Sequence, residues 1–83
     1  MNFMQTFRLV IASVGETLFN GEAVSATVPG SAGECTILPR HEPFVTTLKE
    51  GIITARPRDS APQAFKVMQG VVECSGNNVT VLL

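Results

Sequence analysis

Short apolar runs separated by turn residues repeat along the whole chain. The runs are rich in Val, Ile, Thr and Phe, residue types that favour strands. Turn residues recur roughly every eight to twelve positions, a spacing typical of all-β sandwiches and barrels, and no long helical period interrupts them. The pattern therefore predicts an all-β domain with strands at residues 7–13, 17–19, 22–28, 35–38, 44–48, 52–56, 64–68, 71–74 and 79–82.

The predicted strand at residues 22–28 alternates in polarity. Its apolar side chains Val24, Ala26 and Val28 are separated by Ser25 and Thr27. Because successive side chains of a strand point to opposite faces, one face of this strand is apolar and the other is mildly polar. The runs at residues 9–11 and 79–82 are apolar on both faces, which predicts strands that are covered on their outer side as well.

Glycine, asparagine and proline mark the expected turns. Gly15-Glu16 turns the chain, and Asn20-Gly21 suits a two-residue type I′ hairpin because both positions tolerate positive φ. Gly76-Asn77-Asn78 predicts a tight turn before the last strand. Residues 57–62 are polar and rich in proline, which predicts an exposed loop.

Residues 28–43 form the most constrained segment, with three prolines, two glycines and the only histidine. Gly30 and Gly33 permit positive φ on either side of a turn. Pro39 and Pro43 fix φ and bracket a second turn, which carries His41. The segment therefore predicts two constrained turns that flank one short strand.

The composition limits both size and surroundings. The chain has 83 residues, enough for one domain spanning 1–83. Charged residues make up 16% and hydrophobic residues 45%, which leaves few charges to cover a free surface. We therefore expect part of the outer surface to be buried against a partner.

Charge and hydropathy exclude several classes of protein. A net charge of -1 and the lack of Trp and Tyr argue against nucleic-acid binding. No apolar run reaches the roughly 18 residues that span a bilayer, and Arg8 interrupts the first apolar stretch, so a membrane span and a secretory signal are not expected. Cys35 and Cys74 could pair in an oxidising compartment, but reduced, partly buried thiols fit a non-secreted chain better.

Catalytic and metal-binding motifs fail on spacing. Ser31 lacks the glycines two residues to either side that a nucleophile elbow needs, and the single histidine completes no triad. No lysine follows the loop between Gly30 and Gly33, so direct nucleotide binding is not expected. A zinc site would draw on Glu34, Cys35, His41, Glu42 and Cys74, but their spacing matches no zinc motif. We expect no catalytic residue, no cofactor and no metal.

A biotinyl or lipoyl carrier domain is the alternative of similar size and strand content. Such a domain needs a modifiable lysine at a hairpin tip. The lysine should also be flanked by methionine or acidic residues. Lys66 lies inside a predicted strand, between Phe65 and Val67, and Lys49 lacks such a residue on its N-terminal side. Neither lysine fits the carrier pattern.

Several turn and strand motifs follow one another along almost the whole chain. They are Phe7-x-Leu9-x-Ile11, Leu18-Phe19-x-Gly21-Glu22, Val28-Pro29-Gly30, Gly33-Glu34, Ile37-Leu38-Pro39-x-His41-x-Pro43, Thr46-x-Leu48-x-x-Gly51, Gly70-x-x-Glu73 and Asn78-Val79-Thr80-Val81-Leu82. In this order and approximate spacing the chain resembles the epsilon subunit of F-type ATP synthases, called delta in mitochondria.

The resemblance implies a two-layer β-sandwich of about ten short, mainly antiparallel strands. It also implies a non-catalytic rotor subunit of the central stalk, which links the gamma subunit to the membrane c ring and helps couple ion translocation to ATP synthesis. The implied location is peripheral, on the cytoplasmic face of the cell membrane, or on the matrix or stromal face in an organelle. Membrane association would be indirect, through the c ring.

Site residues follow from the same resemblance. The loop Ser31, Ala32, Gly33 and Glu34 is expected to contact the c ring, with Glu34 as the main contact. Ser13, His41 and Thr46 are expected near gamma and the stalk. The family continues into a C-terminal helical hairpin that inhibits ATP hydrolysis, whereas this sequence stops at Leu83, so we expect it to lack that inhibitory element.

Overall fold

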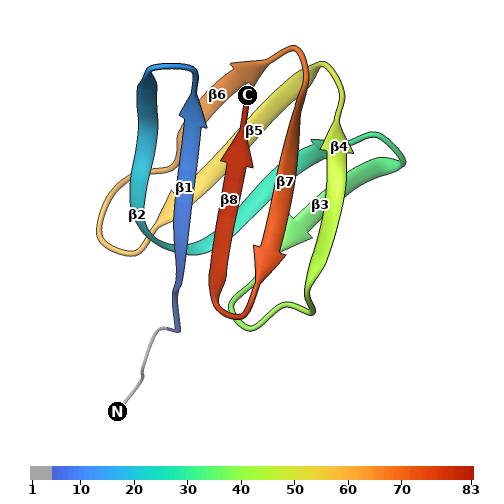
Figure 1. Cartoon of the computed structure of the whole chain (residues 1–83). Coiled ribbons are helices and arrows are strands. Elements are labelled where there is room, and N and C mark those ends of the chain that lie inside the picture. Colours follow the sequence, from blue (N-terminus) through green and yellow to red (C-terminus); the bar gives the residue numbers. More distant parts are fainter. Residues whose placement is uncertain (1–4) are drawn as a thin grey trace.

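The computed structural model describes residues 5–83, which form a two-layer β-sandwich without helices in that range (Figure 1). The predicted all-β class is therefore confirmed. The described residues contain eight strands where about ten were expected. The strands are β1 (Phe7–Ser13), β2 (Glu16–Gly30), β3 (Gly33–Ile37), β4 (Phe44–Leu48), β5 (Gly51–Pro57), β6 (Gln63–Val67), β7 (Gly70–Ser75) and β8 (Asn78–Leu82).

The two layers differ in strand direction. In Figure 1 the strands β1, β8, β7 and β4 run side by side in the front layer, and β3, β5 and β6 cross behind them with most of β2. Every pairing is antiparallel except that of β1 with β8, which is parallel. This agrees with the expected, mainly antiparallel arrangement.

The long strand β2 belongs to both layers. Its first half pairs with β1, from Glu16 to Ala23, and its second half lies between β3 and β5. The ladder with β5 shifts register between Ala23 and Ser25, as at a β-bulge. The bulge reverses which side chains face inward: Ala23 is buried, Val24 and Ser25 are both half-buried, and Ala26 is buried again. The predicted alternation is therefore correct for Ala26 and the residues after it, but Val24 is not part of the core.

The Asn20-Gly21 hairpin prediction is wrong. Both residues lie inside β2, where they pair with Val10 and Leu9, and neither has a positive φ. The chain turns at Val14 and Gly15, where Gly15 has φ 77°, within one residue of the turn predicted at Gly15-Glu16. A hairpin at Asn20 would end the ladder with β1 after a few residues, whereas the continuous strand pairs along the whole of β1.

The core lies between the layers and is mainly aliphatic. Its largest fully buried side chains are Phe7, Leu9, Ile11, Val28, Ile37, Ile53, Val72, Val79 and Val81. These positions alternate along their strands with more exposed ones, as expected for two sheets that each bury one face. Two turn predictions are also confirmed: Gly76 turns the chain with φ 60°, and the loop after Pro57 is exposed.

Candidate functional site

In the turn between β2 and β3, the backbone at Gly30 lies very close to the backbone at Gly33. Gly30 pairs with Gly33, so Ser31 and Ala32 form a two-residue connection. Both glycines permit a positive φ, and Gly33 adopts one, 142°, whereas Gly30 does not. Gly30 is required for another reason: a Cβ there would lie 2.7 Å from the carbonyl oxygen of Gly33.

Ser31 is held by the end of β4. Its backbone N–H donates to the carbonyl oxygen of Thr47 at 2.9 Å, and its hydroxyl donates to the same oxygen at 3.0 Å. The two hydroxyls of Ser31 and Thr47 are also in hydrogen-bond contact. On the other side of the turn, the N–H of Lys49 donates to the carbonyl oxygen of Pro29 at 2.9 Å. The turn is therefore tied to the neighbouring layer from both sides.

Glu34 is the free charge of this turn. It is exposed, and among residues 5–83 its carboxylate makes no salt bridge and no side-chain hydrogen bond. The next residue, Cys35, is half-buried and packs against the core. The carboxylate of Glu34 therefore points outward and the thiol of Cys35 points inward. A cationic group could approach Glu34 without displacing a partner within this part of the chain.

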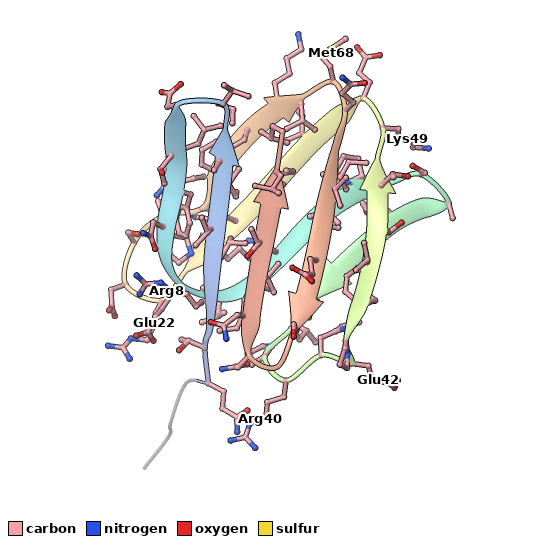
Figure 2. All side chains as sticks on the ribbon, in the orientation of Figure 1. Arg8, Glu22, Arg40, Glu42, Lys49 and Met68 are labelled. Carbon is pink, nitrogen blue, oxygen red and sulfur yellow. The ribbon has the colours of Figure 1, made fainter. Side chains whose placement is uncertain are left out.

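The second candidate turn, around His41, lies at the other end of β4. Pro39 and Arg40 form the turn, and Arg40 has a φ of 62°, the left-handed region that L-residues seldom occupy. Its N–H donates to the side-chain oxygen of Asn77 at 3.0 Å. Figure 2 shows Arg40 and Glu42 projecting at this end, while Lys49 lies toward the opposite end of β4.

His41 itself is half-buried. Its ring packs edge-on against Phe44, with 5.0 Å between ring centroids. Its Nδ1 lies 2.9 Å from the carbonyl oxygen of Glu42, so the tautomer protonated at Nδ1 donates to that oxygen. The thiol of Cys74 lies 3.9 Å from the carbonyl oxygen of His41. Burial raises the pKa of the Cys74 thiol, and the Cys35 thiol adds to that shift. The backbone beneath His41 is thus packed onto β7.

The two remaining site predictions fall in different places. Thr46 lies in β4 beside the first turn, since a Cβ at Gly30 would lie 3.9 Å from its Cγ2. Ser13 is the last residue of β1 and is half-buried. The structure therefore brings Thr46 together with the Ser31 turn. It leaves His41 and Ser13 elsewhere, at opposite ends of the front layer (Figure 1).

The outer face of the front layer is poor in charge. Val45, Val71 and Leu82 are 66%, 39% and 57% exposed. Val71 pairs directly with Leu82, and Glu73, which pairs with Val45, is the charged side chain beside them. We expected these strands to be covered on their outer side. Val10 and Thr80 are half-buried on this face, whereas Leu82 is exposed in the chain by itself.

The side chains in these turns do not form a catalytic or metal-binding arrangement. No three His, Cys, Asp or Glu side chains within residues 5–83 approach closely enough to hold a metal ion. The Ser31 hydroxyl is engaged with Thr47 rather than with a base. The two turns offer an anchored backbone that presents the exposed Glu34 carboxylate and the half-buried His41 imidazole.

Two residues that support these turns were missed by the sequence analysis. Thr47 holds Ser31. The Asn77 side chain accepts from the N–H of Arg40 and donates to the carbonyl oxygen of Thr6 at 2.7 Å, and the backbone carbonyl oxygen of Asn77 accepts from the N–H of Arg8 at 3.0 Å. The Gly76 turn signal located Asn77 but could not show what its side chain reaches. Thr47 carries no local signal, because its contact depends on which strands lie side by side.

Comparison with known proteins adds relatives of similar sequence. Residues 6–83 match the family described as ATP synthase, Delta/Epsilon chain, beta-sandwich domain. The chain is 37% identical over 79 residues to the ATP synthase epsilon chain of Delftia acidovorans, which covers 95% of this chain and 57% of that relative. It is 34% identical over 80 residues to that of Sulfurimonas denitrificans, covering 96% of this chain and 62% of the relative. The chain thus spans less than two thirds of these relatives.

Solved structures share the fold. A chain in the cryo-EM structure of the Euglena gracilis mitochondrial ATP synthase, OSCP/F1/c-ring, aligns with a TM-score of 0.87 at 18% identity, over 99% of this chain and 52% of that one. A chain in the Tetrahymena thermophila mitochondrial ATP synthase central stalk/c-ring structure aligns with a TM-score of 0.78 at 12% identity, over 98% and 65%. At such identities the likeness concerns the fold.

Proposed function

Since this chain belongs to the family of ATP synthase delta/epsilon chain β-sandwich domains, we propose that it is a non-catalytic part of the central stalk of an F-type ATP synthase. In this role it links the gamma subunit to the c ring and helps couple ion translocation to ATP synthesis. The observation that carries the proposal is the anchored β2–β3 turn, which presents the unpaired Glu34 carboxylate at one side of the sandwich.

The body of the domain suits the transfer of torque. β1 is paired on both sides, with β2 and with β8, and β2 joins the two layers covalently. A load on one turn is therefore distributed over several ladders. A joint between gamma and the ring must resist bending, because a compliant joint would let the ring turn without moving gamma.

The proposed ring contact is the turn from Ser31 to Glu34. Glu34 would meet a basic group on a c-ring loop, and an exposed ion pair of this kind contributes about 0 to 1 kcal/mol. Contacts with several ring loops would therefore be needed for a firm grip. Glu34 is available for such a contact with the polar loops of the ring, because it makes no competing salt bridge within residues 5–83.

The proposed gamma contacts are Ser13, His41 and Thr46. They do not form one patch, because Ser13 and His41 lie at opposite ends of the front layer. A gamma segment that touches all three would extend along the sandwich rather than bind at a point. The exposed valines and leucine of the front layer support this proposal, since a partner that lies along this layer would cover Val45, Val71 and Leu82.

The proposed location follows from these partners. Residues 5–83 contain no helix that is long and apolar enough to cross a bilayer. Association with the membrane would be indirect, through the ring, on the cytoplasmic face of a cell membrane or on the matrix or stromal face in an organelle.

The carrier-domain alternative is not supported by the positions of the lysines. Lys66 lies within β6, where it pairs with Ile52. Lys49 connects β4 to β5, but β4 pairs with β7 and β2 whereas β5 pairs with β2 and β6, so this connection is no hairpin tip. Intact mass spectrometry of the native protein would reveal a lysine adduct if the alternative were correct.

The test is stepwise assembly. We expect the chain to co-elute with the gamma subunit and the pair to bind the c ring. At low salt, Glu34→Gln should weaken ring binding by up to about fivefold and leave gamma binding unchanged. Asp59→Asn is the charge control, because it removes one negative charge, which pairs with the adjacent Arg58, from the exposed loop between β5 and β6, on the opposite side from the β2–β3 turn (Figure 1).

Either of two results would contradict the proposal. Failure of the unaltered chain to bind gamma would remove the stalk function while leaving the fold intact. Equal ring affinity of Glu34→Gln and the unaltered chain would remove Glu34 as a contact.

A further inference from the structure

We infer that Thr47, which lies outside every candidate contact, is a positioning residue that fixes the direction in which the β2–β3 turn projects. The inference rests on the proposed function only for the purpose of that turn. Its evidence is the hydrogen bonding between Thr47 and Ser31 and the geometry of the turn that Ser31 begins.

The β2–β3 turn does not have the backbone conformation that is favoured in two-residue hairpins. Two-residue hairpins favour turns with positive φ at one or both central residues, because their twist then matches that of the strands. Ser31 and Ala32 both lack a positive φ, and the positive φ of this turn, 142°, is instead at Gly33. Contacts from outside the hairpin are therefore needed to define where this turn points.

Thr47 supplies those contacts with two different groups. Its carbonyl oxygen accepts from the backbone N–H of Ser31 and from the Ser31 hydroxyl. Because the Ser31 hydroxyl proton is used in that bond, the contact between the two hydroxyls requires the Thr47 hydroxyl to be the donor. One threonine thus orients both the backbone and the side chain of Ser31.

The surrounding backbone makes this position specific. Gly30 pairs with Leu48, and this is the single point at which β2 and β4 are paired. A Cβ at Gly30 would lie 2.7 Å from the carbonyl oxygen of Gly33, so the hairpin itself requires glycine there, whereas toward β4 the same Cβ would lie an ordinary 3.9 Å from Thr46 Cγ2. The approach brings Thr47 within reach of Ser31.

The consequence changes the roles of the candidate residues. The Ser31 hydroxyl is directed at Thr47 and is not free to bind a partner protein. Ser31 therefore attaches the turn to β4 through its hydrogen bonds with Thr47. Ala32 and Glu34 remain exposed and without side-chain hydrogen bonds among residues 5–83. The turn therefore has a tethered first residue and a free carboxylate three residues later.

The test is amide hydrogen exchange of the whole chain, measured by NMR, because the Ser31 N–H is itself part of the tether. Thr47→Val preserves the shape of the side chain and removes the hydroxyl. We expect the exchange of the residue 31 amide to rise roughly 2- to 10-fold, with a similar increase at Gly33 and Glu34. Thr47→Ser should restore the exchange rates of the unaltered chain.

Two further variants separate positioning from general loss of stability. Thr80→Val makes the same change in β8, where the Thr80 side chain forms no hydrogen bond with any of residues 5–83, and should leave exchange in the turn unchanged. Ser31→Ala removes both hydroxyl contacts, so Thr47→Val added to Ser31→Ala should have little further effect. Fully additive effects, or an unchanged residue 31 amide in Thr47→Val, would overturn the inference.

Ring binding distinguishes this inference from the proposed function. Raised exchange in Thr47→Val together with weaker ring binding, both restored by Thr47→Ser, supports the tether and the ring contact. Raised exchange with unchanged ring binding supports the tether and contradicts the ring contact at Glu34.

Discussion

The backbone N–H of Arg40 donates to the side-chain oxygen of Asn77 across 37 residues of sequence, at 3.0 Å. The amide nitrogen of the same Asn77 side chain donates to the carbonyl oxygen of Thr6 at 2.7 Å. One side chain therefore connects the His41 turn to the chain entering β1. The end of the sandwich that carries His41 depends on this link.

Asn77→Ala should lower the free energy of unfolding by about 1 to 2 kcal/mol, because it removes two hydrogen bonds that each contribute about 0.5 to 1.5 kcal/mol and are open to water. Urea unfolding measures the change. Asn20→Ala is the control, since Asn20 is also exposed but makes no side-chain hydrogen bond, and it should change stability by less than about 0.5 kcal/mol. Equal effects of the two variants would contradict the role of Asn77.

Arg40→Gly should leave the protein as stable as before or stabilise it by up to about 1 kcal/mol. The φ of 62° costs an L-residue roughly 1 to 2 kcal/mol, and glycine avoids that cost at the expense of greater freedom in the unfolded chain. Arg56→Gly, within β5 where Arg56 pairs with Ser25, should instead destabilise by about 0.5 to 1 kcal/mol. Thermal unfolding of both variants checks the opposite signs.

Gly30→Ala should destabilise the fold by about 1 to 3 kcal/mol, because the new Cβ would lie 2.7 Å from a backbone oxygen that cannot move without opening the hairpin. Gly21→Ala is the matched change in the same strand. There the Cβ would meet the Phe19 ring at 3.7 Å, an ordinary contact, so its stability should stay close to that of the unaltered chain. Chemical unfolding measures the stability of both variants. If Gly30→Ala is as stable as Gly21→Ala, the close approach of Gly30 to the carbonyl oxygen of Gly33 is not required for the fold.

The stability of the protein should fall in mildly alkaline solution because of Cys74. Burial raises the pKa of its thiol, so above the ordinary thiol value of about 8.5 the unfolded chain loses a proton that the folded chain keeps. The stability contributed by the neutral thiol is complete below that value. It falls as the pH rises toward the folded-state pKa, by at most about 1.4 kcal/mol per pH unit.

Urea unfolding under reducing conditions at several pH values checks this dependence. Cys74→Ala should be less stable at neutral pH because it leaves a space in the core, but it should lose less stability between neutral and alkaline pH. An identical slope in the two proteins would assign the alkaline loss to other groups.

Most of the fold could be predicted from the alternation of side chains, because strands that bury one face carry that signal locally. The exception was β2. Asn20-Gly21 has the local preference of a hairpin, but the ladder with β1 extends through both residues, and Gly15 makes the turn instead. A pairing that is distant in sequence thus overrode a turn preference confined to two residues.

The candidate site was predictable only in part, for a related reason. A turn rich in glycine and serine followed by a charged residue indicated an exposed Glu34, and Glu34 is exposed. The hold of Thr47 on Ser31 follows from the single pairing between Gly30 and Leu48, which no property of residues 46–48 reveals. The geometry of a loop that rests on another strand becomes visible only with the fold.

The continuity of β2 has a mechanical consequence. A force applied at the Ser31 turn along the second half of β2 runs parallel to that half, which lies between β3 and β5, before the strand continues into the other layer to pair with β1. The hydrogen bonds of the second half to β3 and β5 are then loaded in shear, many at once, rather than peeled open one after another. Strands pulled along their length in this way yield last, so the bulge at Ala23, where the ladder is interrupted, is the point at which we expect β2 to bend first.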